Sequence, residues 1–155
     1  MRRPERRMDQ KVLQSLLRRS SVGRLATINR AGYPVIKPVN FIYMEGKLYL
    51  HSSPRGEKIA DLRRGSPVCF ELDEPIAYAP ASGHACWAGY FYRSVFVKGK
   101  AKLLKDPAQK QRVLQRLMEK YQPEGGYGPI PPAELKKTAI VEISIEEMTG
   151  KEKLD

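Results

Sequence analysis

The fold of this chain is decided by residues 22–52, which read VGRLATINRAGYPVIKPVNFIYMEGKLYLHS. Three runs within this stretch place apolar side chains at alternate positions, which is the period of a β-strand with one buried face. The runs cover residues 22–28, 33–43 and 47–52. The segments between them contain Asn-Arg-Ala-Gly and Glu-Gly, which are turn-forming sequences. The stretch therefore predicts an antiparallel three-stranded meander.

Outward from this meander, the remaining apolar periodicities predict three helices and three further strands. The helices are expected over residues 8–19, 53–64 and 106–121, and the strands over residues 68–72, 91–104 and 139–145. Residues 74–89 and 122–132 carry Pro and Gly without a clear period and are expected to be loops. Strands and helices do not alternate, and a GxGxxG fingerprint is absent. The pattern favours a mainly β fold, a small six-stranded barrel with peripheral helices, over a doubly wound sheet.

The composition fits one globular domain over residues 1–155, with a basic N-terminal arm at residues 1–7 that is a candidate for disorder. Hydrophobic residues make up 41% of the chain and charged residues 29%. No apolar run approaches the roughly 20 residues that span a bilayer. The basic N-terminus is not followed by an apolar stretch, so no secretory signal is expected. We therefore expect a cytoplasmic protein without a membrane segment.

The formal net charge of +11 suggests a polyanionic partner. The cations are dispersed along the chain, however, which is typical of solvated surfaces, so specific nucleic-acid binding is not expected. The only cysteines are Cys69 and Cys86, and they form no CxxC pair. Two cysteines and two histidines this far apart make a poor zinc site, so no metal is expected.

The end of the third strand leads into a segment suited to bind an anion. Residues 48–58 read LYLHSSPRGEK. Ser53 and Pro54 are typical of the N-cap and first position of a helix, which Gly65 would end. A helix N-terminus presents unpaired N–H groups, and Lys58 adds a full positive charge. The segment predicts a phosphate cradle around Lys58; the alternative is a strand-to-helix turn with surface cations.

Five segments taken together resemble a known family. They are VGRLAT at 22–27, GYP and PVNF at 32–41, LHS and GEK at 50–58, YRSV and GKA at 92–101, and IEEMTGK at 145–151. Their order and spacing resemble the pyridoxamine 5′-phosphate oxidase-like FMN-binding split barrels. The branch that the sequence resembles most is related to nitroimidazole-resistance (Nim) proteins. The resemblance covers residues 7–151, which is nearly the whole chain.

This resemblance implies a six-stranded antiparallel Greek-key split β-barrel and a homodimer that binds FMN at its interface. The residues expected to line the flavin are Arg24, Leu25, Ala26, Thr27, Pro38, Val39 and Asn40. His51, Ser52 and Ser53 are expected near the ribityl-phosphate or the ring, with Lys58 on the phosphate. Tyr92, Arg93 and Ser94 would approach from the neighbouring strand or from the other subunit.

The resemblance also implies an oxidoreductase that takes electrons from a small donor and reduces a small acceptor such as a nitroaromatic or a quinone. His51 is the candidate catalytic residue, as a proton donor; a strand-end histidine bonded to backbone is the alternative. The C-terminal residues TGKEKLD lack the basic substrate motif of true pyridoxamine phosphate oxidases. The other expectation left open is a binding protein without turnover that carries a flavin, a haem or a deazaflavin.

Overall fold

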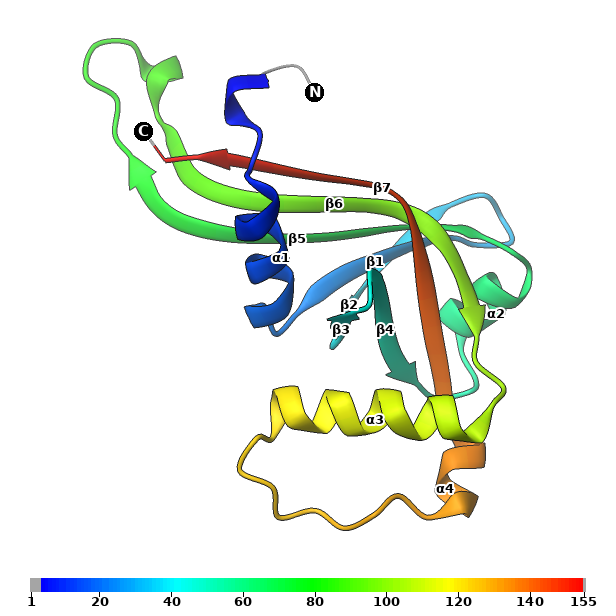
Figure 1. Ribbon diagram of the computed structural model, residues 1–155. Helices are drawn as coiled ribbons and strands as arrows, with labels where there is room; N and C mark the ends of the chain where they lie inside the picture. The colour runs from blue at the N-terminus through cyan, green and yellow to red at the C-terminus, as the bar shows by residue number, and fades with distance from the viewer. Residues whose placement is uncertain (1–3, 155) are drawn as a thin grey trace.

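The computed structural model describes residues 4–154 as a curved antiparallel sheet with helices at its rim (Figure 1). The seven strands have the order β2-β1-β5-β6-β7-β4-β3. They are β1 (Gly23–Ile28), β2 (Pro34–Val39), β3 (Ile42–Met44), β4 (Lys47–Ser52), β5 (Pro67–Ala79), β6 (Gly89–Leu103) and β7 (Ala139–Lys153). The helices are η1 (Pro4–Arg6), α1 (Gln10–Arg19), α2 (Glu57–Arg63), η2 (Ala85–Trp87), α3 (Pro107–Tyr121) and α4 (Pro132–Lys137). The expected mainly β fold is confirmed; residues 1–3 of the basic arm expected at 1–7 lie outside the described residues.

The strand count is seven rather than the predicted six, because the strand expected over residues 33–43 divides at Asn40-Phe41. Both Phe41 and Ile42 are buried, which breaks the alternation of a single strand. The Phe41 ring packs edge-on against Phe70 in the barrel, with 4.8 Å between ring centroids. The Phe41 backbone bonds the hydroxyl of Tyr121 on α3 instead of a neighbouring strand. The predicted three-stranded meander is therefore wrong: β1 pairs with β2 and β3 pairs with β4, but β2 and β3 lie at opposite edges of the sheet.

Strands β5 and β7 are much longer than the sequence predicted, and they run together with β6, which has nearly its predicted length, to one end of the molecule (Figure 1). Residues 74–79, predicted to be part of a loop, continue β5, and a register shift between Pro75 and Ala77 accommodates the proline. The extension of β7 carries mostly charged side chains. The extension pairs with its neighbour through cross-strand ion pairs, such as Arg93 Nε–Glu152 Oε2 at 3.1 Å, and not through an apolar face. The extension therefore has no apolar period in the sequence.

The core consists of two parts, one inside the barrel and one outside it beneath α3. Helix α1 covers one barrel opening with Leu13, Leu16 and Leu17 buried. This packing needs a glycine at Gly150 of β7, where an added Cβ would lie 2.8 Å from Leu13 Cδ1. Helix α3, predicted to within one residue, covers the outer surface of β3, β4 and β7 through Val113 and its neighbours.

The outer surface of β1, β2, β5 and β6 instead exposes apolar side chains. Pro38, Arg24, Glu71 and Phe96 lie side by side across these four strands in that order. Phe96 is 49% exposed, and Ile36 on β2 is 64% exposed. We call this the open sheet face. Its large exposed apolar residues are Ile28, Ile36 and Phe96.

Candidate functional site

Helix α2 begins at Glu57, four residues later than the sequence predicted. Gly56 is its N-cap, with φ of 110°, a backbone conformation that favours glycine. Ser53 is therefore not the cap, and Pro54 is not in the helix; the Ser53 hydroxyl accepts from the Arg55 amide at 3.4 Å instead. The helix ends before Gly65, which has φ of +82°, as predicted.

Lys58 on α2 lies close enough to two other basic side chains for their charges to act on one another: Lys37 on β2 and His51 at the end of β4. Desolvation, and then the positive charge of Lys37, lower the pKa of Lys58. His51 keeps an exposed surface, yet desolvation and then the charge of Lys58 lower its pKa too. We call these three residues the cation cluster.

The charges in the cation cluster are only partly balanced. Lys37 Nζ lies 3.0 Å from Glu57 Oε2. Within residues 4–154, however, no carboxylate lies within ion-pair distance of Lys58, although its side chain is partly buried. A partly desolvated ammonium beside two other basic groups favours a bound anion. The donor set therefore fits a phosphate.

A buried polar network fixes α2 on the sheet. Asp61 is 1% exposed; it accepts a hydrogen bond from the Thr27 hydroxyl at 2.8 Å and one from Arg64 at 2.7 Å. Desolvation raises the pKa of Asp61, but these hydrogen bonds and the charge of Arg64 outweigh it and hold the pKa below its usual value. The network ties the helix that carries Lys58 to the C-terminal end of β1.

The flavin-lining residues predicted on β1 and β2 divide between the two sides of the sheet, because consecutive strand residues alternate. Arg24, Ala26 and Pro38 lie on the open sheet face. The side chains of Leu25, Thr27 and Val39 face inward and are buried. The Arg24 guanidinium bonds Glu71 at 2.6 Å and also pairs with Asp73, so its charge is balanced within the chain.

The other predicted residues near β4 are engaged in local bonding. The Asn40 side-chain amide donates to the backbone carbonyl of Ser21 at 3.1 Å. Ser52 is the last residue of β4 and pairs with Ala139 of β7. Asn40 and Ser52 thus stand at the two ends of the chain segment that carries β3 and β4.

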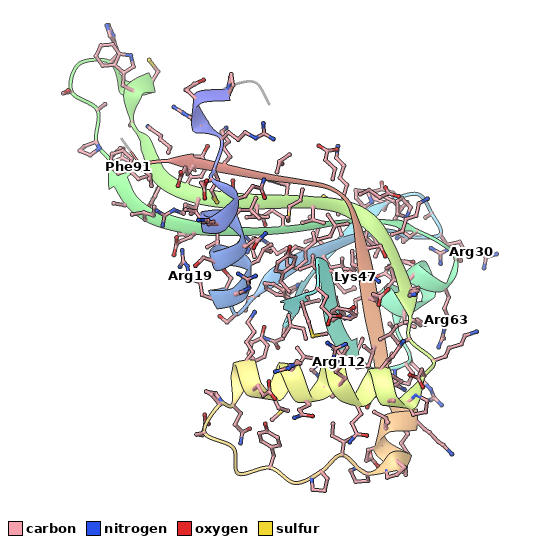
Figure 2. All side chains as sticks on the ribbon, viewed as in Figure 1. Arg19, Arg30, Lys47, Arg63, Phe91 and Arg112 are labelled. Atoms are coloured by element: carbon pink, nitrogen blue, oxygen red, sulfur yellow. The ribbon has the colours of Figure 1, made fainter. Side chains whose placement is uncertain are left out.

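Tyr92, Arg93 and Ser94 lie at the far end of β6, away from α2. Figure 2 labels Phe91 at one end of the sheet and Arg63 of α2 at the other. Arg93 is held by Glu152 at 3.1 Å and Glu74 at 3.3 Å, and Ser94 is buried. A single chain therefore does not bring this segment to the cation cluster.

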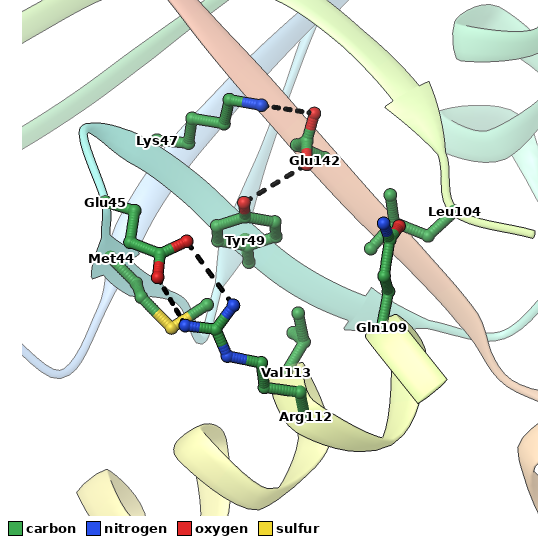
Figure 3. Close-up of a pocket in the computed structure, with 9 residues that line it drawn as sticks. All are labelled: Met44, Glu45, Lys47, Tyr49, Leu104, Gln109, Arg112, Val113 and Glu142. Carbon is green, nitrogen blue, oxygen red and sulfur yellow. Dashed lines mark hydrogen bonds and ion pairs between the residues drawn. The ribbon is translucent and has the colours of Figure 1, made fainter. Parts of the chain in front are cut away.

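The sequence reasoning did not single out a pocket of about 190 Å³ between β4, β7 and α3 (Figure 3). The buried Glu142 in its wall accepts from Lys47 at 3.0 Å and from Tyr49 at 3.1 Å, and Lys102 lies 3.2 Å away. Desolvation and the neighbouring Glu142 raise the pKa of Tyr49 to about 12. These polar groups satisfy one another, which is the pattern of a structural network.

Lys37 was not predicted among the FMN-binding residues, although the sequence contained a signal for it. It occupies the inward series Val35-Lys37-Val39, where a charged residue stands among apolar ones. Lys120 on α3 interrupts the apolar stripe of Val113 and Leu117 in the same way. A cation on the buried side of an amphipathic element is therefore a useful signal.

The curved sheet, open between β2 and β3 and flanked by peripheral helices, defines the class of split β-barrels. The family model described as pyridoxamine 5′-phosphate oxidase matches residues 9–152. The chain belongs to this family. No curated protein matches the sequence.

Three solved structures have a similar fold. A candidate 5-nitroimidazole antibiotic resistance protein from Bacteroides thetaiotaomicron is 23% identical, covers 92% of this chain and 83% of its own, and has a TM-score of 0.81. The flavocytochrome Anf3 from Azotobacter vinelandii is 22% identical over 96% of this chain and 69% of its own, with a TM-score of 0.85. The FAD and heme binding protein from Mycobacterium smegmatis is 19% identical over 95% and 72%, with a TM-score of 0.85. At these identities the likeness concerns the fold.

Two further observations bear on the expectations from the sequence. No helix between residues 4 and 154 is both long and apolar enough to cross a membrane. Across the same residues, no group of three or more His, Cys, Asp or Glu side chains is placed to hold a metal ion.

Proposed function

We propose that this protein binds FMN as a homodimer and transfers electrons from a small donor to a small acceptor such as a nitroaromatic or a quinone. The observation that carries the proposal is the partly buried Lys58, which faces Lys37 and His51 without a carboxylate of its own within the described chain. A phosphate monoester carries roughly two negative charges near neutral pH. Such a group would supply the missing counter-charge.

The relatives support a redox cofactor rather than another phosphate. Two of the structural relatives are a flavocytochrome and an FAD and heme binding protein. The barrel of this chain has the same fold, and its family is named for an oxidase. Among flavins we favour FMN, because it carries a single phosphate for the one cation cluster.

The chain's own part in the reaction is to bind, orient and exchange a proton. Bound FMN supplies hydride and single-electron transfer. Lys58 and Lys37 would hold the phosphate, and the Asp61 network keeps α2 in place. His51 is the candidate proton donor; its lowered pKa favours the neutral imidazole, which would take up a proton at a ring nitrogen before passing it on. Arg93 is already paired with two glutamates, so its positive charge is largely balanced within the chain and is not free for a cofactor.

The open sheet face is where the second subunit would pack. It combines exposed Ile36 and Phe96 with the outward residues Arg24 and Pro38. A second copy on this face would bury the apolar side chains. It would also bring its own 92–94 segment to the first subunit, which one chain alone cannot do.

A cytoplasmic location stays a prediction.

The test is a titration of the purified protein with FMN, followed by visible absorbance and flavin fluorescence. We expect bound flavin, and we expect Lys58→Ala to weaken binding by about 1–3 kcal/mol, roughly 5- to 150-fold. Arg63→Ala removes an exposed cation from the other end of the same helix and should leave the affinity unchanged. A colourless protein that gains no flavin absorbance would refute the proposal. Mass spectrometry that finds a haem or a deazaflavin instead would favour a carrier of that cofactor.

A further inference from the structure

A wide groove of about 500 Å³ lies between α1, β3 and α3, on the side of the barrel that α3 covers. Its basic lining comes from two helices, with Arg18 on α1 and Arg112, Arg116 and Lys120 on α3. Glu45 and Glu119 are its acidic residues. Cations thus outnumber carboxylates in the groove.

Two of these cations are neutralised within the groove. Arg112 forms a two-pronged ion pair with Glu45, which Figure 3 shows at the edge of the neighbouring pocket. Arg116 lies 2.7 Å from Glu119. These pairs use both acidic residues of the groove, so nothing acidic in its lining is left for the other two cations.

Lys120 is the first of the unbalanced cations. Its ammonium donates to the Phe41 carbonyl at 2.9 Å and lies 4.0 Å from the centroid of the Phe41 ring. No carboxylate lies within ion-pair distance of it among residues 4–154. Desolvation lowers the pKa of Lys120 to about 8, so the charged amine has lost much of its hydration. A bound anion would restore the stabilisation that water no longer provides.

Arg18 is the second cation in the groove that has no carboxylate partner in its lining. Its guanidinium stands 5.8 Å from the centroid of the Tyr43 ring, and its only side-chain hydrogen bond within the described chain is to Gln14, at 3.4 Å. Guanidinium groups bind planar oxyanions in two-pronged fashion. Tyr43 and Met44 of β3 supply an apolar wall between the two helices. The groove thus offers two cations without a carboxylate partner in its lining, one on α1 and one on α3, next to an apolar wall.

We infer that this groove is a second ligand site, which binds a small aromatic molecule carrying a carboxylate or a phosphate. The aromatic ring lies against Tyr43, and the anionic group reaches Arg18 and Lys120. The site shares no residue with the cation cluster at α2. The inference is therefore independent of the proposed FMN site.

The experiment measures binding of phenyl phosphate and benzoate by calorimetry, with phenol and inorganic phosphate as partial ligands. We expect saturable binding of at least one aromatic anion, and weaker or no binding of phenol and of phosphate. Arg18→Met and Lys120→Met should each reduce the affinity about tenfold or more. Lys136→Met, on exposed α4 away from the groove, is the matched control and should bind like the parent protein.

Circular dichroism checks that each variant is folded, and Arg18→Met on the exposed side of α1 keeps the test available if Lys120→Met is unstable. The inference is overturned if neither aromatic anion binds up to millimolar concentration. It is also overturned if phenol or phosphate alone binds as tightly, or if Lys136→Met weakens binding as much as the groove variants. Lys58→Ala should leave benzoate binding unchanged, which separates this site from the flavin site.

Discussion

His51 and Lys58 repel each other across the gap between β4 and α2, which makes the folded protein sensitive to pH. Because the pKa of His51 is lowered on folding, the unfolded chain binds more protons than the folded one just below the ordinary value of 6.5. The contribution of His51 to stability is therefore fully present above pH 6.5 and is lost as the pH falls through the folded pKa. We expect the urea concentration at the unfolding midpoint of the cofactor-free protein to decrease as the pH is lowered from 7.5 to 5.5.

The chain has only two histidines, so substitution of His51 is the test and substitution of His84 is its matched control. His51→Asn should flatten the pH dependence of the urea midpoint, whereas His84→Asn, in an exposed loop, should keep it. An unchanged slope in His51→Asn would show that His51 is not the group that titrates.

At the scale of elements, the attachment of α2 to β1 depends on one carboxylate. Asp61→Ala removes the partner of Arg64 and leaves the buried hydroxyl of Thr27 without its acceptor. We expect a loss of about 1–3 kcal/mol in the free energy of unfolding, measured by urea denaturation. Adding Thr27→Val should restore part of that loss, because the unsatisfied hydroxyl is then gone. A loss that the second substitution does not reduce would mean that Thr27 and Asp61 act separately.

The elements with a clear local signal were predicted well, and those without one were not. Strand β4 and helix α3 have strong periods and clear turn or capping residues, so their bounds were predicted to within a residue. The start of α2 was wrong because Ser53 and Pro54 also suit a loop, and Gly56 provides the cap. Helix α4 was missed because its six residues lie in a Pro-rich segment too short to show a period.

At the scale of the whole molecule, we predict that a second copy covers the open sheet face. Phe96→Glu places a charge in the middle of that face and should convert the dimer to a monomer in sedimentation at micromolar concentration. Flavin affinity should fall at the same time, because the 92–94 segment of the other copy is lost. Tyr127→Glu, which changes an exposed aromatic in the loop after α3, should remain dimeric. A parent protein that sediments as a monomer would contradict the prediction.

The candidate site could be predicted from the sequence only in its parts. Lys58 and His51 were identified because they lie seven residues apart on a strand and the helix that follows it. Their approach to Lys37 depends on α2 packing over the β1–β2 hairpin, which no local pattern encodes. The separation of Tyr92 from that cluster likewise follows from the length of β6, and the sequence underestimated how far β5 and β7 extend beside it.

Strand β7 lies between β6 and β4, and this position governs how the chain can be made. During synthesis, β4 emerges long before residues 139–153, its partner on one side, so its backbone groups on that side wait unpaired for the time needed to add almost ninety residues. Until then, β3 and β4 form a hairpin detached from the other strands. Contacts between such distant segments are slow to form, and the waiting edge is open to pairing with other chains. That edge of β4 is therefore exposed for a defined period of synthesis, which ends when β7 enters the sheet.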